Sequence, residues 1–150
     1  MKKLLIITIL CATAIAAKAP ESGVIHIIKH KPIVDMGSPA EWLNAIIWVE
    51  SGYGQYNPKE PQAVGILQQH PVFVDDVNRI IGKKKYSYDD RLDPKKAIQM
   101  FFIYQRFYNP EMDFEVMCRT QVGGPLGMKK KCTEPYYNMV RDKLFSKFYR

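Results

Sequence analysis

Glu50 is the residue whose position in this sequence most clearly suggests chemistry. The apolar residues before it recur at the spacing of one helical face, and Glu50 continues that face near the helix end marked by Gly52. Loss of hydration and the negative end of the helix dipole both disfavour an anion, so we expect the pKa of this carboxyl group to be raised. A glutamate that keeps its proton near neutral pH can act as a general acid, as in the cleavage of a glycosidic bond. The simpler alternative is a half-exposed Glu50 that only ends a turn. The face is formed by Trp42, Leu43, Ile46, Ile47 and Glu50.

Three further short motifs follow Glu50-Ser51 along the chain. They are Gly65-Ile66-Leu67-Gln68, Asp93-Pro94 and Gly123-Gly124-Pro125. In this order and with these gaps, the four motifs resemble the soluble lytic transglycosylase and goose-type lysozyme superfamily across residues 38–145. The pair formed by Glu50-Ser51 and the Gly-x-x-Gln motif carries most of the resemblance.

The resemblance implies a lysozyme-like fold and a role for each motif. Glu50 is similar to the single catalytic acid and base of the superfamily, and Ser51 to the residue that helps hold its surroundings. Gly65 to Gln68 would line a substrate cleft beside the glutamate, and Gly123 and Gly124 would add to the substrate-binding residues. No metal and no cofactor is implied.

The reaction implied by the resemblance is that of a peptidoglycan lytic transglycosylase. Such an enzyme cleaves the β-1,4 bond between N-acetylmuramic acid and N-acetylglucosamine and leaves a 1,6-anhydro product. Most glycosidases use two carboxylates, and no second carboxylate has a motif here, so the N-acetyl group of the substrate would assist instead. A hydrolytic muramidase and a non-catalytic glycan-binding or assembly protein on the same scaffold are the alternatives.

Two positions depart from the family pattern. The family has an aromatic residue and an asparagine before its Gly-Pro turn, whereas this chain has Gln121 and Val122. The tyrosine that would contact the glutamate or the substrate is therefore missing from that place. Four tyrosines elsewhere are candidates to replace it, namely Tyr53, Tyr56, Tyr104 and Tyr136.

The elements that must position these residues are mainly helical. Capping signals and apolar spacing predict a helix from Ser38 to Gly52, then helices over 71–81, from Asp93 to Pro110, over 113–121, and from a cap at Thr133. The last helix would carry Tyr137, Val140, Leu144 and Phe148 on one side. Residues 53–69 predict irregular structure or a small hairpin. The expected fold class is mainly α, of the α+β lysozyme-like kind, with one globular domain of about five helices in residues 38–150.

The N-terminal residues predict export from the cytoplasm. Two lysines, an apolar run and small residues are typical of a cleavable signal peptide, here residues 1–16 or, alternatively, 1–19. An extended arm of residues 17–37 would follow, in which His26 and His30 lack a third ligand for a metal. We therefore expect a secreted or periplasmic monomer without stable membrane insertion after cleavage.

Charge and cysteine content restrict the partners further. The formal net charge is +7, which in an exported protein favours anionic surfaces and polymers such as peptidoglycan strands. The lysine runs have no recognisable nucleic-acid reading motif, so no nucleic-acid partner is expected. Cys118 and Cys132 could form a disulfide worth about 3 kcal/mol, or they could remain two thiols.

Overall fold

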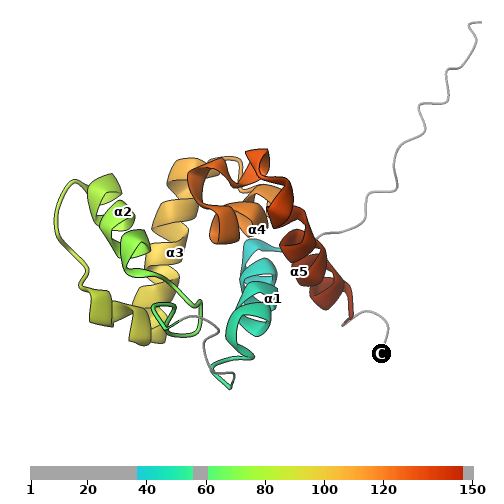
Figure 1. Cartoon of the computed structure of the whole chain (residues 1–150), viewed down its shortest axis with the longest axis horizontal. Coiled ribbons are helices and arrows are strands. Elements are labelled where there is room, and N and C mark those ends of the chain that lie inside the picture. The colour runs from blue at the N-terminus through green and yellow to red at the C-terminus, as the bar shows by residue number, and fades with distance from the viewer. Residues whose placement is uncertain (1–36, 56–60, 147–150) are drawn as a thin grey trace, which may run out of the picture. The chain divides into compact units, whose positions relative to one another are not determined.

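Five α-helices make up most of the described part of the chain (Figure 1). The computed structural model describes residues 37–55 and 61–146. These residues form a mainly helical single domain, as the sequence predicts. Within them no helix is both long enough and apolar enough to cross a membrane. The helices are α1 (Pro39–Ser51), α2 (Pro71–Ile81), α3 (Pro94–Tyr108), α4 (Phe114–Gly123) and α5 (Glu134–Ser146), with 3₁₀ turns η1 (Tyr88–Leu92), η2 (Gly124–Lys129) and η3 (Lys131–Thr133).

Several of the predicted features lie outside the described residues. The signal peptide falls there in either form, as do the arm except Gly37 and the pair His26 and His30. Tyr56 and Phe148 lie outside as well.

The predicted limits of the first three helices are confirmed by their caps. Ser38 and Glu41 form a capping box at the start of α1, and Gly52 ends the helix in the left-handed conformation at φ 55°. Gly82 ends α2 in the same way at φ 76°. At the start of α3 the Asp93 carboxylate accepts hydrogen bonds from the backbone of the first turn.

The beginning of α5 differs from the prediction that Thr133 caps this helix. The Thr133 hydroxyl lies 2.7 Å from the Lys130 carbonyl oxygen and accepts a hydrogen bond from Arg119 Nε at 2.9 Å. The first contact lies in the turn before α5, and the second comes from α4, so the hydroxyl ties this turn to α4 instead of capping the helix. Arg119 is itself buried and also binds the carbonyl oxygens of Met128 and Lys130, which explains why the glycine-rich segment is ordered.

For residues 53–69 a hairpin is one of two expectations, and the described residues of this segment form no strand. Within residues 61–70 the structure has turns and a single isolated bridge between Val64 and Gln69. Arg91 holds this segment by donating from Nη1 to the carbonyl oxygens of Gln62 and Gln69, both at 2.9 Å. Gly65 adopts φ +74°, and a Cβ atom there would lie 2.0 Å from the Arg91 carbonyl oxygen, so a glycine is required.

Apolar packing divides into two clusters. The larger cluster joins α1, α4 and α5 with Leu67 and two residues of α3, Ala97 and Phe101. The smaller one joins α2 and α3 through Val74, Val77, Tyr86, Met100 and Tyr104. In agreement with this division, α1 packs against α5, and α2 against α3.

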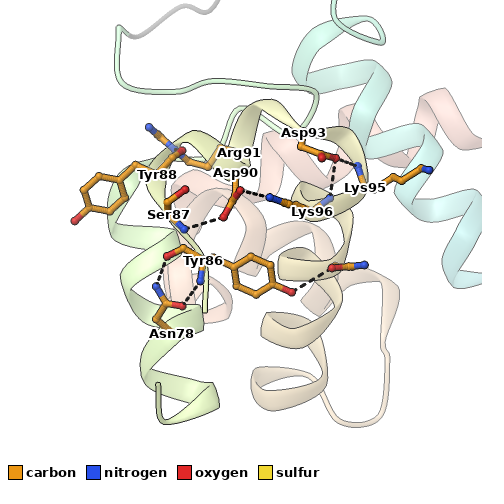
Figure 2. Close-up of polar contacts among 10 residues, drawn as sticks. Asn78, Tyr86, Ser87, Tyr88, Asp90, Arg91, Asp93, Lys95 and Lys96 are labelled. Atoms are coloured by element: carbon orange, nitrogen blue, oxygen red, sulfur yellow. Dashed lines mark hydrogen bonds and ion pairs between the residues drawn. The ribbon is translucent and has the colours of Figure 1, made fainter. Parts of the chain in front are cut away.

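A polar network fixes the loop between α2 and α3 (Figure 2). Asn78 donates to the Tyr86 carbonyl oxygen at 2.8 Å and accepts from the Tyr86 amide at 2.9 Å. Farther along, Asp90 caps η1 through the Ser87 amide and pairs with Lys96 of α3. These side-chain hydrogen bonds hold the loop beside the smaller cluster.

The predicted disulfide is not present. Cys118 and Cys132 are both free thiols, the first buried in the larger cluster and the second exposed. Cys118 is on the inner face of α4, whereas Cys132 is in η3 on the surface. Burial raises the pKa of the Cys118 thiol, so this side chain behaves as an apolar core residue.

Candidate active site

Glu50 lies in the last turn of α1 and is half-buried. Two hydrogen bonds reach its Oε1 atom. The Tyr136 hydroxyl of α5 donates one at 2.6 Å, and Gln121 Nε2 of α4 donates the other at 3.2 Å. The carboxyl group is therefore held between three helices, and both of these donors are uncharged.

Tyr136 is the tyrosine that reaches Glu50 from another element. It is buried, and burial together with the neighbouring Glu50 raises its pKa well above the ordinary value. The hydroxyl thus keeps its proton and remains a donor over the whole neutral range. A sequence signal for it exists, because Tyr136, Val140 and Leu144 recur every four residues and form the buried stripe of α5. Tyr137, predicted for that stripe, is only partly buried.

Gln121 connects Glu50 to the segment around Leu67. Its Nε2 donates to the Leu67 carbonyl oxygen at 3.0 Å as well as to Glu50. This glutamine occupies the place where the family pattern has an aromatic residue. A hydrogen-bonding role for it was not predicted, because only the tertiary structure brings residues 71 positions apart together.

Ser51 holds the same segment from the other side. It is 1% exposed, and its hydroxyl donates to the Ile66 carbonyl oxygen at 2.8 Å while accepting from the Gly54 amide at 2.9 Å. Leu67 is fully buried in the larger cluster, and Ile66 packs against that cluster. Ser51, Ile66 and Leu67 therefore act on any ligand through the position of the backbone.

Gln68 is half-buried and has an unusual backbone conformation. Its φ is +46°, and its side-chain Nε2 donates to the Gly65 carbonyl oxygen at 2.8 Å. The next residue, Gln69, is 3% exposed and donates from Nε2 to the Ala97 carbonyl oxygen at 3.1 Å. Its Oε1 is buried without a hydrogen-bond partner among the described residues.

A groove of about 610 Å³ lies beside these residues. One wall is Gln121, Val122 and the Gly123-Gly124-Pro125 turn, and the other is α2. Gln68 and Gln69 lie between the walls, and Tyr104 also contributes. A groove of this size falls in the range that holds small-molecule or oligomeric ligands, roughly 300–1,000 Å³.

The predicted site residues separate into three groups in the structure. Gln68, Gly123 and Gly124 line the groove. Glu50 does not line it, but it is hydrogen-bonded to Gln121, which does. Ser51, Ile66 and Leu67 support the groove from behind, and Gly65 makes its close backbone approach to Arg91.

The α2 wall brings charged residues to the groove that no motif predicted. Asp76 accepts from Arg79 Nε at 2.8 Å and from the Tyr108 hydroxyl at 3.0 Å, and Asp75 accepts from the Tyr88 hydroxyl at 3.0 Å. Across the described residues, His, Cys, Asp and Glu side chains form no group of three that could hold a metal ion.

Comparison with known proteins adds no relative to this picture. A scan against protein-family models gave no match, nor did searches of curated proteins and of solved structures.

Proposed function

We propose that the protein is a secreted or periplasmic lytic transglycosylase that cleaves peptidoglycan, with Glu50 as its acid and base. One observation carries this proposal. The Glu50 carboxyl group is half-buried, accepts hydrogen bonds from Tyr136 and Gln121, and is linked through Gln121 to a groove. General acid catalysis requires the carboxyl group within hydrogen-bond reach of the ligand or one water away from it, and the bond to Gln121 places Glu50 next to the groove.

The proposed reaction uses the same carboxyl group twice. Protonated Glu50 gives its proton to the glycosidic oxygen as the bond to the muramic acid carbon breaks, and the N-acetyl group of the substrate stabilises that carbon. The resulting Glu50 carboxylate then removes the proton of the muramic acid 6-hydroxyl, whose oxygen closes the anhydro ring. Between the two steps the anion is stabilised by the donors Tyr136 and Gln121.

The other carboxylates of the groove support a single-residue route. Asp76 is engaged by Arg79 and Tyr108, and Asp75 by Tyr88. Both carboxylates therefore already have protein partners, and neither is placed beside Glu50 as a second catalytic group.

The test compares fragment release from insoluble cell wall by the wild-type protein and by Glu50→Gln. This substitution keeps the shape of the side chain and removes its acid, and we expect fragment release to fall to background. Glu111→Gln is the matched control, because Glu111 is exposed in the turn after α3 and does not line the groove. Equal release by wild type and Glu50→Gln would remove Glu50 from the reaction.

A second candidate is glycan binding without cleavage. The observation that favours it is the absence of Glu50 from the residues that line the groove. In that case Glu50, Tyr136 and Gln121 would only hold three helices together. The same experiment separates the two candidates, because a binding protein would sediment with the cell wall and release no fragments.

A further inference from the structure

Arg79 of α2 is fixed at the edge of the groove with part of its guanidinium unused. Asp76 accepts from both Nε and one terminal nitrogen, and the Tyr108 hydroxyl contacts that same terminal nitrogen. The guanidinium carbon also lies 5.7 Å from the centre of the Phe107 ring. These contacts hold the planar group in one orientation, although 57% of the side chain is exposed.

The remaining terminal nitrogen of Arg79, Nη1, has no partner among the described residues. A guanidinium has five N–H donors in a fixed plane and binds carboxylates with good geometry. The Asp76 and Tyr108 contacts already order the Arg79 side chain. Binding of a ligand carboxylate to its free donors would therefore cost less side-chain entropy.

The surroundings of Arg79 add positive charge on both sides. Across the groove, the exposed Lys130 lies on the opposite wall, where its Nζ donates to the Gly123 carbonyl oxygen at 2.7 Å. On its other side, Arg79 borders a second hollow of about 700 Å³ that Lys83 and Lys84 also line. The negative groups nearby are Asp75, Asp76 and Asp89. Asp75 and Asp76 both accept hydrogen bonds from protein donors.

The wall of the second hollow is rigid where it meets α2 (Figure 2). The Asn78 side chain fixes the backbone of Lys85 and Tyr86, and Tyr88 extends beside this loop. Lys83 and Lys84 therefore extend from an ordered backbone. They line the same hollow as Arg79, so a ligand group that extends past Arg79 would lie near them.

From this arrangement we propose that Arg79 forms a subsite for a carboxylate carried by the glycan strand in the groove. Two groups of the strand have that chemistry, namely the lactyl ether of muramic acid and the peptide stem attached to it. The inference rests on the proposed function only in taking the ligand to be a cell-wall glycan. Its consequence is that the protein distinguishes a strand with carboxylates from a neutral N-acetylglucosamine polymer of the same length.

The test measures dissociation constants for three tetrasaccharides in the Glu50→Gln background, which prevents turnover. The probes are chitotetraose, an alternating N-acetylglucosamine and N-acetylmuramic acid tetrasaccharide with free lactyl carboxylates, and the same tetrasaccharide with peptide stems. We expect at least one of the two carboxylated probes to bind roughly twofold to fivefold tighter than chitotetraose, as for one ion pair at an exposed site. The probe that gains affinity identifies the group that Arg79 binds.

The Arg79→Gln substitution should remove this preference, so that the carboxylated probes and chitotetraose bind with nearly equal dissociation constants. Arg106→Gln is the matched control, because it removes the same charge from an exposed position of α3 outside the groove; it should keep the preference. Tyr108→Phe disturbs the hydrogen bonds of Asp76 but leaves the Arg79 cation in place. This variant should keep most of the preference for carboxylated probes. If Arg79→Gln fails to fold, judged by circular dichroism, Arg79→Lys replaces it and should lose part of the preference.

Three results would overturn the inference. Equal affinity for all three probes would reject it and leave a glycan-binding groove standing. A preference that survives Arg79→Gln would assign the carboxylate to other cations. No binding of any probe would reject both the inference and the proposed function.

Discussion

Two of the carboxyl groups that accept a hydrogen bond from a tyrosine, Glu50 and Asp76, lie in very different surroundings. Glu50 and Tyr136 meet at the larger apolar cluster, and Tyr136 is buried. Asp76 and Tyr108 meet on the exposed side of the smaller cluster, where Arg79 joins them. The first pair receives uncharged donors from Tyr136 and Gln121, whereas the second is neutralised by a cation.

The difference teaches how one fold can prepare two carboxyl groups for two tasks. Tyr136 and Gln121 give Glu50 hydrogen bonds that carry no charge, whereas Arg79 gives Asp76 both a hydrogen bond and a charge. Under the proposed function the first pair serves proton transfer, and the second orders the Arg79 side chain for recognition.

The largest effect on stability is expected at Gly65, whose backbone lies against Arg91 of η1. Gly65→Ala would place a Cβ atom against the Arg91 carbonyl oxygen in a left-handed conformation, so the free energy of unfolding should fall by more than about 2 kcal/mol. Gly82→Ala is the matched control, because Gly82 has nearly the same φ and open space around it; it should lose about 1 kcal/mol. Urea unfolding measures both, and equal losses would contradict a requirement for close approach at Gly65.

The two tyrosines compare the sides directly. Tyr136→Phe removes a buried hydrogen bond to Glu50 and should reduce the free energy of unfolding by about 1.5–2 kcal/mol. Tyr108→Phe removes a part-buried one to a carboxylate that keeps its contacts with Arg79, and should cost less than about 1 kcal/mol. If chemical denaturation gave the reverse order, the Glu50 side would not be the more tightly constrained of the two.

Alkaline pH should weaken the fold through its buried acids. Burial raises the pKa of Tyr136, Tyr104 and Cys118 in the folded protein. The unfolded chain loses these protons near the ordinary pKa values, 9.0 for the thiol and 10.0 for the tyrosines, while the folded chain keeps them. Stability should thus be unaffected by these groups below pH 9 and fall as pH rises toward the raised values.

Tyr136→Phe isolates one of these groups. Above pH 10 the free energy of unfolding of this variant should fall less steeply with pH than that of the wild type. The two slopes should differ by about 1.4 kcal/mol per pH unit. Denaturant midpoints across this range provide the measurement. A slope no shallower than that of wild type would mean that Tyr136 ionises in the folded protein as readily as in the unfolded chain.

The smallest effect concerns the thiols. Because Cys118 and Cys132 are free, a reducing agent should leave the denaturant midpoint unchanged, whereas loss of a bridge would cost about 3 kcal/mol. An alkylating reagent added to the native protein should modify Cys132 and spare Cys118, as peptide masses would report. Protection of Cys132 together with a midpoint that reductant lowers would instead indicate a disulfide.

Local signals in the sequence predict the helices well. Ser38, Gly52, Gly82 and Asp93 act within one turn of their own position, so their effect on the chain can be inferred without the rest of the fold. Thr133 shows the limit of such reasoning, because Arg119 and the preceding turn use its hydroxyl. The same limit applies to the hairpin, which the Arg91 contacts replace with turns.

The candidate site could be predicted only in part. Glu50 is identifiable from its helical face, but its donors Gln121 and Tyr136 lie 71 and 86 residues away along the chain. Contacts at such separation depend on how α1, α4 and α5 pack, and no local sequence pattern encodes that packing. The charged α2 wall is missed for the same reason, since Asp76 and Arg79 read as ordinary surface residues of an amphipathic helix.

The masses of the fragments that the protein releases from purified cell wall give the most direct test of the proposed Glu50 chemistry. With Glu50 serving as both acid and base, wild-type fragments should be one water lighter than those of hydrolysis, and Glu50→Gln should release none. Fragments with the full hydrolytic mass, or identical fragments from both proteins, would contradict the account.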